Sequence, residues 1–175
     1  MDDLPKASQP IAGRQCETCT LCCKLMKVDE LEKPMGTWCR HCRPGVGCGI
    51  YETRPNVCRA YHCGYLQSAE VSDAWYPARS WIILNPEEIG IVAYVDPGRP
   101  TAWMAEPYYS DLKSWARGQL ANERQVIVRV GRRQIAILPD RDVDLGIVGD
   151  DEEIVVERTN SAAGARYDVH KWKRV

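Results

Sequence analysis

The sequence contains no phenylalanine and no long apolar run. Its six tryptophans and eight tyrosines must therefore supply the aromatic part of any core, with side chains that carry a polar group. No stretch reaches the roughly 20 apolar residues that cross a bilayer. The net charge is only −1, which gives no electrostatic attraction to nucleic acid or to an anionic membrane. We therefore expect no membrane partner, and the composition disfavours a nucleic-acid partner.

The start of the chain lacks the features of a secretory signal. MDDLPKASQPIAGRQ has neither a basic segment nor an apolar run after it, so we expect a cytoplasmic protein. Residues 1–15 combine proline, glycine and polar side chains, which predicts a flexible tail. The length of 175 residues suits one domain, or a small module joined to a second one.

Cysteine is absent after residue 63, yet nine cysteines precede that point. A reducing cytosol disfavours structural disulfides, and the odd number leaves at least one thiol unpaired. Glycine and proline are scattered through the same segment, so it cannot fold on apolar burial alone. We therefore expect metal binding to supply part of its folding free energy. The predicted metal ligands are Cys16, Cys19, Cys22, Cys23, Cys39, Cys42, Cys48, Cys58 and Cys63.

The spacing of these cysteines is compatible with two kinds of metal centre. Three cysteines separated by two residues each, with a distant fourth, are a ligand set of [4Fe–4S] clusters. Two Cys-x2-Cys pairs, here Cys16–Cys19 and Cys39–Cys42, are instead a ligand set of structural zinc. The adjacent Cys22 and Cys23 point in different directions, so each can serve a different centre. We predict one or two metal centres that hold a [4Fe–4S] cluster, zinc or both.

The remaining thiols lie in recognisable local patterns. Cys48 is flanked by glycines that permit close approach of the backbone to a sulfur, which favours a ligand over a simple turn. Cys58 and His62 are four residues apart and would share one face of a short helix, with Cys63 just past its end. His62 and His41 are weaker ligand candidates, because most histidines near such sites lie outside the ligand shell.

Four arginines are interleaved with the cysteines: Arg40, Arg43, Arg54 and Arg59. They can compensate the negative charge of metal-bound thiolates. The alternative is an anion or nucleic-acid site, but no aromatic stacking platform accompanies them and the chain is not basic. Charge compensation is the better interpretation.

The second half of the chain predicts a small sheet and one clear helix. A helix over residues 111–120 is expected after an N-cap at Ser110, because its apolar residues share one face. Two strands are predicted at residues 81–84 and 89–95, with a turn at 85–88 between them. Residues 125–130 and 134–138 are predicted to form a hairpin. Further strands are expected at 144–148 and 153–158, with an edge strand within 167–175. His170 is expected at the surface.

These patterns predict an α+β fold, in which an irregular Cys-rich metal-binding segment packs on a small, mostly antiparallel sheet with one or two helices. The expected units are the tail at residues 1–15, the Cys-rich module at 16–79 and an α+β domain at 80–175.

Residues 16–63 also resemble a known family. The string that carries the resemblance is Cys16-x2-Cys19-x2-Cys22-Cys23, then Gly47-Cys48-Gly49-Ile50-Tyr51-Glu52-x-Arg54-Pro55-x2-Cys58-Arg59-x-Tyr61-x-Cys63. It resembles the CxxCxxCC family of bacterial proteins, which is described as zinc- or iron-chelating or as Fe–S-cluster-containing. The resemblance implies metal binding but no particular reaction. Similar cysteine segments occur in flagellin lysine methylases, which suggests an Fe–S centre without implying that activity.

The function expected from the sequence is metal binding in a structural, redox or sensing role, with metal ions and a redox or protein partner. Two alternatives remain: an Fe–S-dependent oxidoreductase or transferase, and a zinc module that contacts protein or RNA. The sequence has no Gly-rich nucleotide loop after a strand, no HExxH and no Gly-x-Ser-x-Gly. A non-enzymatic role is therefore favoured.

Overall fold

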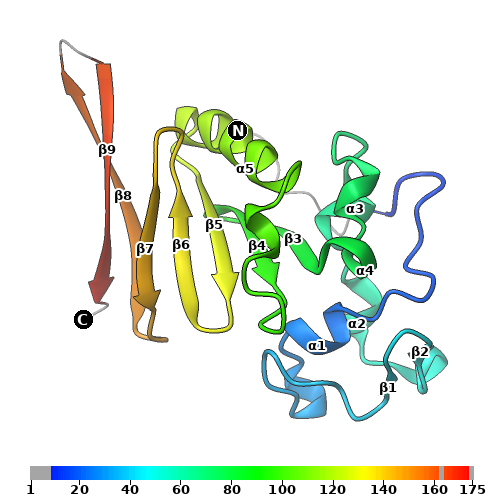
Figure 1. Cartoon of the computed structure of the whole chain (residues 1–175). Coiled ribbons are helices and arrows are strands. Elements are labelled where there is room, and N and C mark those ends of the chain that lie inside the picture. Colours follow the sequence, from blue (N-terminus) through cyan, green and yellow to red (C-terminus); the bar gives the residue numbers. More distant parts are fainter. Residues whose placement is uncertain (1–8, 162–163, 174–175) are drawn as a thin grey trace.

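The structure, a computed structural model, describes residues 9–161 and 164–173. It has an α+β fold built around a five-stranded mixed sheet, with a helix packed on one side and the Cys-rich segment on the other (Figure 1). The predicted fold class is confirmed. Residues 1–8 of the expected tail and the last two residues of the expected edge strand lie outside the described residues.

The helices are short except for the one that covers the sheet. They are α1 (Cys22–Leu25), α2 (Asn56–Ala60), α3 (Gly64–Gln67), α4 (Pro77–Ser80) and α5 (Tyr108–Ala121), with 3-10 turns η1 (Asp29–Leu31), η2 (Tyr51–Thr53), η3 (Asp73–Trp75) and η4 (Ala102–Met104). Within the described part of the chain, no helix combines the length and apolarity needed to cross a membrane.

The strands form three separate sheets. They are β1 (Cys42–Arg43), β2 (Gly47–Cys48), β3 (Ile82–Glu87), β4 (Gly90–Val95), β5 (Gln125–Val130), β6 (Arg133–Ile137), β7 (Asp142–Ile147), β8 (Glu152–Ser161) and β9 (Gly164–Lys173). The central sheet has the order β3-β4-β5-β6-β7, and only β4 and β5 are parallel. This parallel pair needs a long crossover connection, and α5 lies within it. The hairpin of β5 and β6 occurs where it was predicted.

Two local predictions were wrong. The turn predicted at residues 85–88 is mostly strand, since β3 continues to Glu87 and pairs Glu87 with Gly90. Pro86 is tolerated there because β3 is the edge strand of the sheet. The long helix begins at Tyr108 after Pro107, so Ser110 lies inside its first turn and is not the N-cap.

The central sheet is buried on both faces. Ile82, Leu84 and their neighbours in register face α5, and Trp75 fills the middle of that layer with no exposed surface. The Trp75 ring centroid lies 4.9 Å from that of Tyr108 and 5.0 Å from that of Trp115. These tryptophan and tyrosine rings provide the aromatic packing that phenylalanine supplies in other proteins.

The opposite face of the sheet is covered by the Cys-rich segment. Ile83 and Val92 lie in one core cluster with Leu21 and Leu25 of the α1 region and with Cys63, which precedes α3. The Cys-rich segment thus shares a core with the sheet.

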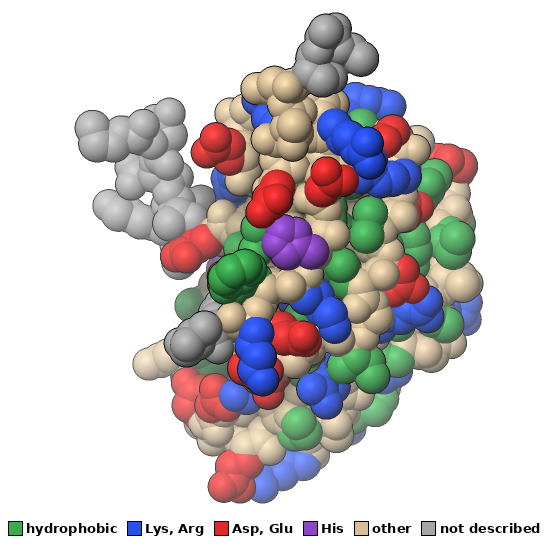
Figure 2. All heavy atoms as spheres, turned by 90° about the vertical axis from the view of Figure 1, so that its left-hand side faces the viewer, with side chains coloured by type: hydrophobic (Ala, Val, Ile, Leu, Met, Phe, Trp, Pro, Cys, Tyr) green, Lys and Arg blue, Asp and Glu red, His purple; other side chains and the backbone are tan. Residues whose placement is uncertain are grey.

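The β8–β9 hairpin extends beside β7 at the far end of the sheet from the cysteines (Figure 1). Ile154 and Val169 pack against the core of the sheet, and Lys171 Nζ donates to the Ile147 carbonyl at 3.1 Å. The exposed face at this end carries acidic and basic side chains close together (Figure 2). His170 lies partly exposed on β9, with Nε2 at 3.8 Å from a carboxylate oxygen of Glu157.

Candidate metal centre

The first cysteines lie on a turn that leads into α1. The Cys19 amide donates to the Cys16 carbonyl at 2.7 Å, which closes the turn. Cys22 is the first residue of α1, and the buried Leu25 at the end of this helix fixes it to the sheet. Because Leu25 anchors α1 to the sheet, Cys22 at the start of this helix and the cysteines of the preceding turn are held close together.

Cys63 joins these residues from a distant part of the sequence. It is buried at the N-cap of α3, in the core cluster against which Cys19 and Cys22 pack. Burial raises the pKa of the Cys63 thiol to about 11, and the neighbouring Cys16 and Cys19 add to this shift. We call Cys16, Cys19, Cys22 and Cys63 the first thiol group.

The β1–β2 hairpin brings further cysteines beside α1. The Cys39 amide donates to the Cys23 carbonyl at 2.9 Å, and the Cys42 amide donates to the Cys39 carbonyl at 3.0 Å. Cys42 lies directly opposite Cys48 in the hairpin. Burial raises the pKa of the Cys42 thiol to about 12, and the proximity of Cys23 contributes to this shift.

Cys58 lies within α2. Burial raises the pKa of its thiol, and Cys23, Cys39 and Cys48 raise it further, so these groups are close enough to interact electrostatically. We call Cys23, Cys39, Cys42, Cys48 and Cys58 the second thiol group. The two groups adjoin at α1, where Cys22 and Cys23 are consecutive and the Cys22 side chain, followed by burial, raises the pKa of Cys23.

The thiols lie near one another but are not arranged as a complete set of metal ligands. Across residues 9–161 and 164–173, no three histidine, cysteine, aspartate or glutamate side chains are arranged to hold a metal ion. Thiols within each group instead interact with one another, Cys16 with Cys19 in the first and Cys42 with Cys23 in the second. The nine predicted ligands therefore stay a prediction, and coordination would require the cysteine side chains to rotate between staggered positions.

A buried cation beside the second thiol group was missed by the sequence reasoning. Lys33 is only 5% exposed, and its Nζ donates to the carbonyls of Lys24 and Pro34 at 3.1 Å each and to that of Met26. Burial lowers the pKa of Lys33, and the nearby Cys39 and Cys23 oppose this shift. No sequence signal marks this residue, because a lone lysine is normally exposed.

Two of the interleaved arginines mainly brace the loop before α2. The Arg54 guanidinium stacks on the Tyr51 ring at 3.6 Å and donates to the Tyr51 carbonyl at 2.6 Å. Arg59 Nε donates to the Arg54 carbonyl at 3.0 Å. Burial raises the pKa of the Cys16 thiol, and the neighbouring Cys19 raises it further. The positive charge of Arg54 acts in the opposite direction and lowers this pKa. Arg54 therefore also acts on the thiols electrostatically.

The helix predicted to carry His62 is shorter than expected. Because α2 ends at Ala60, His62 does not share a helical face with Cys58, and that prediction was wrong. His62 Nδ1 is buried and makes no hydrogen bond to any described residue. His41 Nε2 accepts a hydrogen bond from Arg40 Nε at 3.2 Å.

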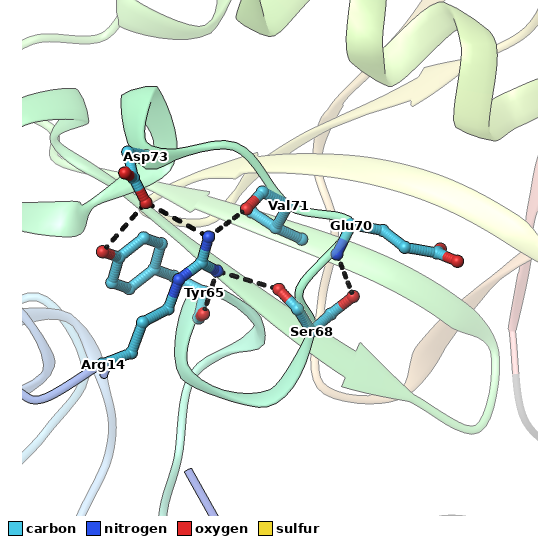
Figure 3. A network of polar contacts seen from close by, with 6 residues as sticks. All are labelled: Arg14, Tyr65, Ser68, Glu70, Val71 and Asp73. Carbon is cyan, nitrogen blue, oxygen red and sulfur yellow. Dashed lines mark hydrogen bonds and ion pairs between the residues drawn. The ribbon is translucent and has the colours of Figure 1, made fainter. Parts of the chain in front are cut away.

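Arg14 anchors the segment that leads to Cys16 (Figure 3). Its guanidinium donates to the carbonyls of Tyr65, Ser68 and Val71 at 2.6, 2.8 and 2.6 Å. It also lies over the Tyr65 ring at 4.1 Å and pairs with the exposed Asp73 carboxylate at 3.2 Å. This part of the expected tail is thus attached to the chain that follows Cys63, which holds the two ends of the first thiol group together.

Replacing Arg14 by alanine is expected to lower the free energy of unfolding by about 2 kcal/mol, because three carbonyls lose a charged donor. Arg14→Lys should recover little of the lost free energy of unfolding, since one ammonium group cannot donate to three separated carbonyls. Denaturant titration of the metal-loaded protein gives the free energy of unfolding of wild type and of both variants. Arg166→Ala, which removes an arginine side chain that is 75% exposed, is the control and should change little. Full rescue by lysine would contradict this account of Arg14.

No relative of the chain was found among known proteins. No family model, no curated protein and no solved structure matched the chain. The resemblance of residues 16–63 to the CxxCxxCC family therefore stays a prediction carried by the cysteine spacing. The function has to be argued from the thiols themselves.

Proposed function

We propose that the protein binds metal at two cysteine centres, one in each thiol group. The observation that carries this proposal is that cysteines from several segments between Cys16 and Cys63 lie near one another, in two adjoining groups beside one sheet. Ordinary packing does not explain so many neighbouring thiols. Metal ions displace the thiol protons on binding, so raised thiol pKa values do not prevent coordination by a tightly bound metal.

The first thiol group supports a [4Fe–4S] cluster. Cys16, Cys19 and Cys22 are the closely spaced cysteines, and Cys63 is the distant fourth that such a ligand set requires. The alternative in which Cys16 and Cys19 share zinc with the Cys39–Cys42 pair is less well supported, because that pair lies with Cys23 and Cys48.

The second thiol group supports structural zinc. Its Cys-x2-Cys turn leads into a two-stranded hairpin that places Cys48 opposite Cys42, and tetrahedral zinc needs four of its five thiols. Lys33 supplies a nearby positive charge that would offset the excess charge of a four-thiolate zinc centre. Since this group joins α1, β1–β2 and α2, we assign it a structural role. We also propose that the protein works in the cytoplasm, where reduced thiols are maintained.

Metal analysis of matched cysteine variants tests the two-centre proposal. Anaerobically purified protein is expected to be brown and to contain iron, acid-labile sulfide and zinc. Cys63→Ser should lose iron and sulfide but keep zinc, and Cys39→Ser should lose zinc but keep the visible absorption. Loss of both metals from each folded variant would contradict separate centres. A folded wild-type protein with no bound metal would overturn the proposal entirely.

A further inference from the structure

Two polar atoms without hydrogen-bond partners lie next to the first thiol group. The Tyr61 hydroxyl and His62 Nδ1 are both buried, and neither forms a hydrogen bond to any described residue. These residues are consecutive, in the connection between α2 and α3, and Cys63 follows at once. Buried polar groups are nearly always paired, because an unpaired group has given up its hydrogen bonds to water. The two that directly precede Cys63 are therefore candidates for a partner that the chain itself does not supply.

Tyr61 is the better placed of the two to meet the thiols. Its ring packs against the core cluster that contains Cys63 and against which Cys19 and Cys22 also pack. The side chain thus lies in the same layer as three of the four cysteines of the first thiol group. Its hydroxyl is one of the buried polar atoms that the described residues leave unpaired, and it belongs to a side chain that packs with these cysteines.

Another tyrosine on the same face of the sheet shows the usual arrangement. The Tyr94 hydroxyl donates to Glu87 Oε1 at 2.7 Å and accepts from Arg129 Nη1 at 3.2 Å. Burial of a tyrosine in this layer is therefore compatible with a paired hydroxyl when an acceptor is present. The Tyr61 hydroxyl has no such partner among the described residues.

We propose that the Tyr61 hydroxyl donates a hydrogen bond to a metal-bound thiolate of the first thiol group, which makes Tyr61 a positioning residue for that centre. This inference rests on the proposed function. A neutral thiol is only a weak acceptor, whereas a thiolate carries charge and accepts a stronger hydrogen bond. The bond therefore gains its strength when metal replaces the thiol proton. Hydrogen bonds to ligand sulfurs influence both metal affinity and reduction potential.

Tyr61→Phe tests this role because it removes the hydroxyl and keeps the ring. Wild type and variant are purified anaerobically with their metal, and two quantities are measured: release of iron to a chelator and the reduction potential of the cluster. We expect about tenfold weaker iron retention in the variant. We also expect a more negative potential, since the ligand sulfurs lose a donor that stabilises their charge. A hydroxyl with only a packing role would leave the potential unchanged.

Tyr108→Phe is the matched control. Its hydroxyl donates to the Ala74 carbonyl at 3.0 Å, and its ring packs on the α5 side of the sheet. Iron retention and potential should therefore equal those of wild type. If wild type holds iron and Tyr61→Phe matches it in both measurements, the role of Tyr61 is overturned while metal binding stands. If folded wild type holds no metal at all, the proposed function fails first.

Discussion

Removal of bound metal is expected to open the Cys-rich segment and expose one face of the central sheet. Metal binding contributes on the order of 10 kcal/mol to the folding of small thiolate domains. That is comparable to the whole stability of a domain of this size. Leu21, Leu25 and Leu66 attach this segment to the sheet through apolar contacts, and the metal is expected to supply the rest of its stability. Without metal it should detach.

Hydrogen exchange before and after treatment with a strong chelator measures this effect. Amides of α1 and α3 should lose protection, and those of β4 should lose part of theirs, because Val92 and Tyr94 become uncovered. Amides of α5 supply the internal control, since this helix packs on the other face through Leu112 and Ala116. Unchanged exchange in α1 after complete loss of metal would contradict a folding role for the metal.

Trp75→Ala is expected to destabilise the protein by about 3–5 kcal/mol, the usual cost of removing a large aromatic side chain from a packed core. Trp75 has no exposed surface and contacts the rings of Tyr108 and Trp115. Its Nε1 also donates to Asp111 Oδ2 at 2.7 Å, so the substitution leaves this carboxylate without its donor. Denaturant titration followed by circular dichroism measures the change.

Trp172→Ala is the control for this substitution. Trp172 is 56% exposed on β9, and its loss should change stability by no more than about 0.5 kcal/mol. Because Trp75 lies on the face of the sheet opposite the thiols, the folded Trp75→Ala protein should keep its metal. A destabilisation of less than about 1 kcal/mol would show that the cavity closes at little cost, contrary to close packing around Trp75.

Local patterns predicted the parts of the fold that depend on neighbouring residues. The hairpin of residues 125–138 followed from two runs of β-branched and apolar residues around a turn, where Gly131 adopts a φ of +59°. The parallel pairing of β4 with β5 could not be predicted in this way, because it depends on a crossover. At Gly90, with a φ of +137°, an added Cβ would lie 1.9 Å from the Gln125 carbonyl oxygen. Only glycine permits that approach.

The assignment of the cysteines as metal ligands stays a prediction, and the sequence could not give their arrangement. Spacing marked all the cysteines, yet it could not decide whether Cys16 and Cys19 join the Cys39–Cys42 pair or Cys63. The position of Cys63 depends on the packing of α3 against β3, where a Cβ on Gly64 would lie 2.9 Å from Leu84 Cβ. Such contacts between distant segments leave no local pattern.

The order in which the chain is synthesised determines when the Cys-rich segment can dock on the sheet. The thiols leave the ribosome first, whereas the surface that covers the first thiol group includes Ile127 and Ala136, which are made much later. Until those strands emerge, the nascent Cys-rich segment has no complete surface on which to dock. If these thiols bind metal as proposed, they are expected to depend on reduction or on a supply of metal while most of the chain is still being translated.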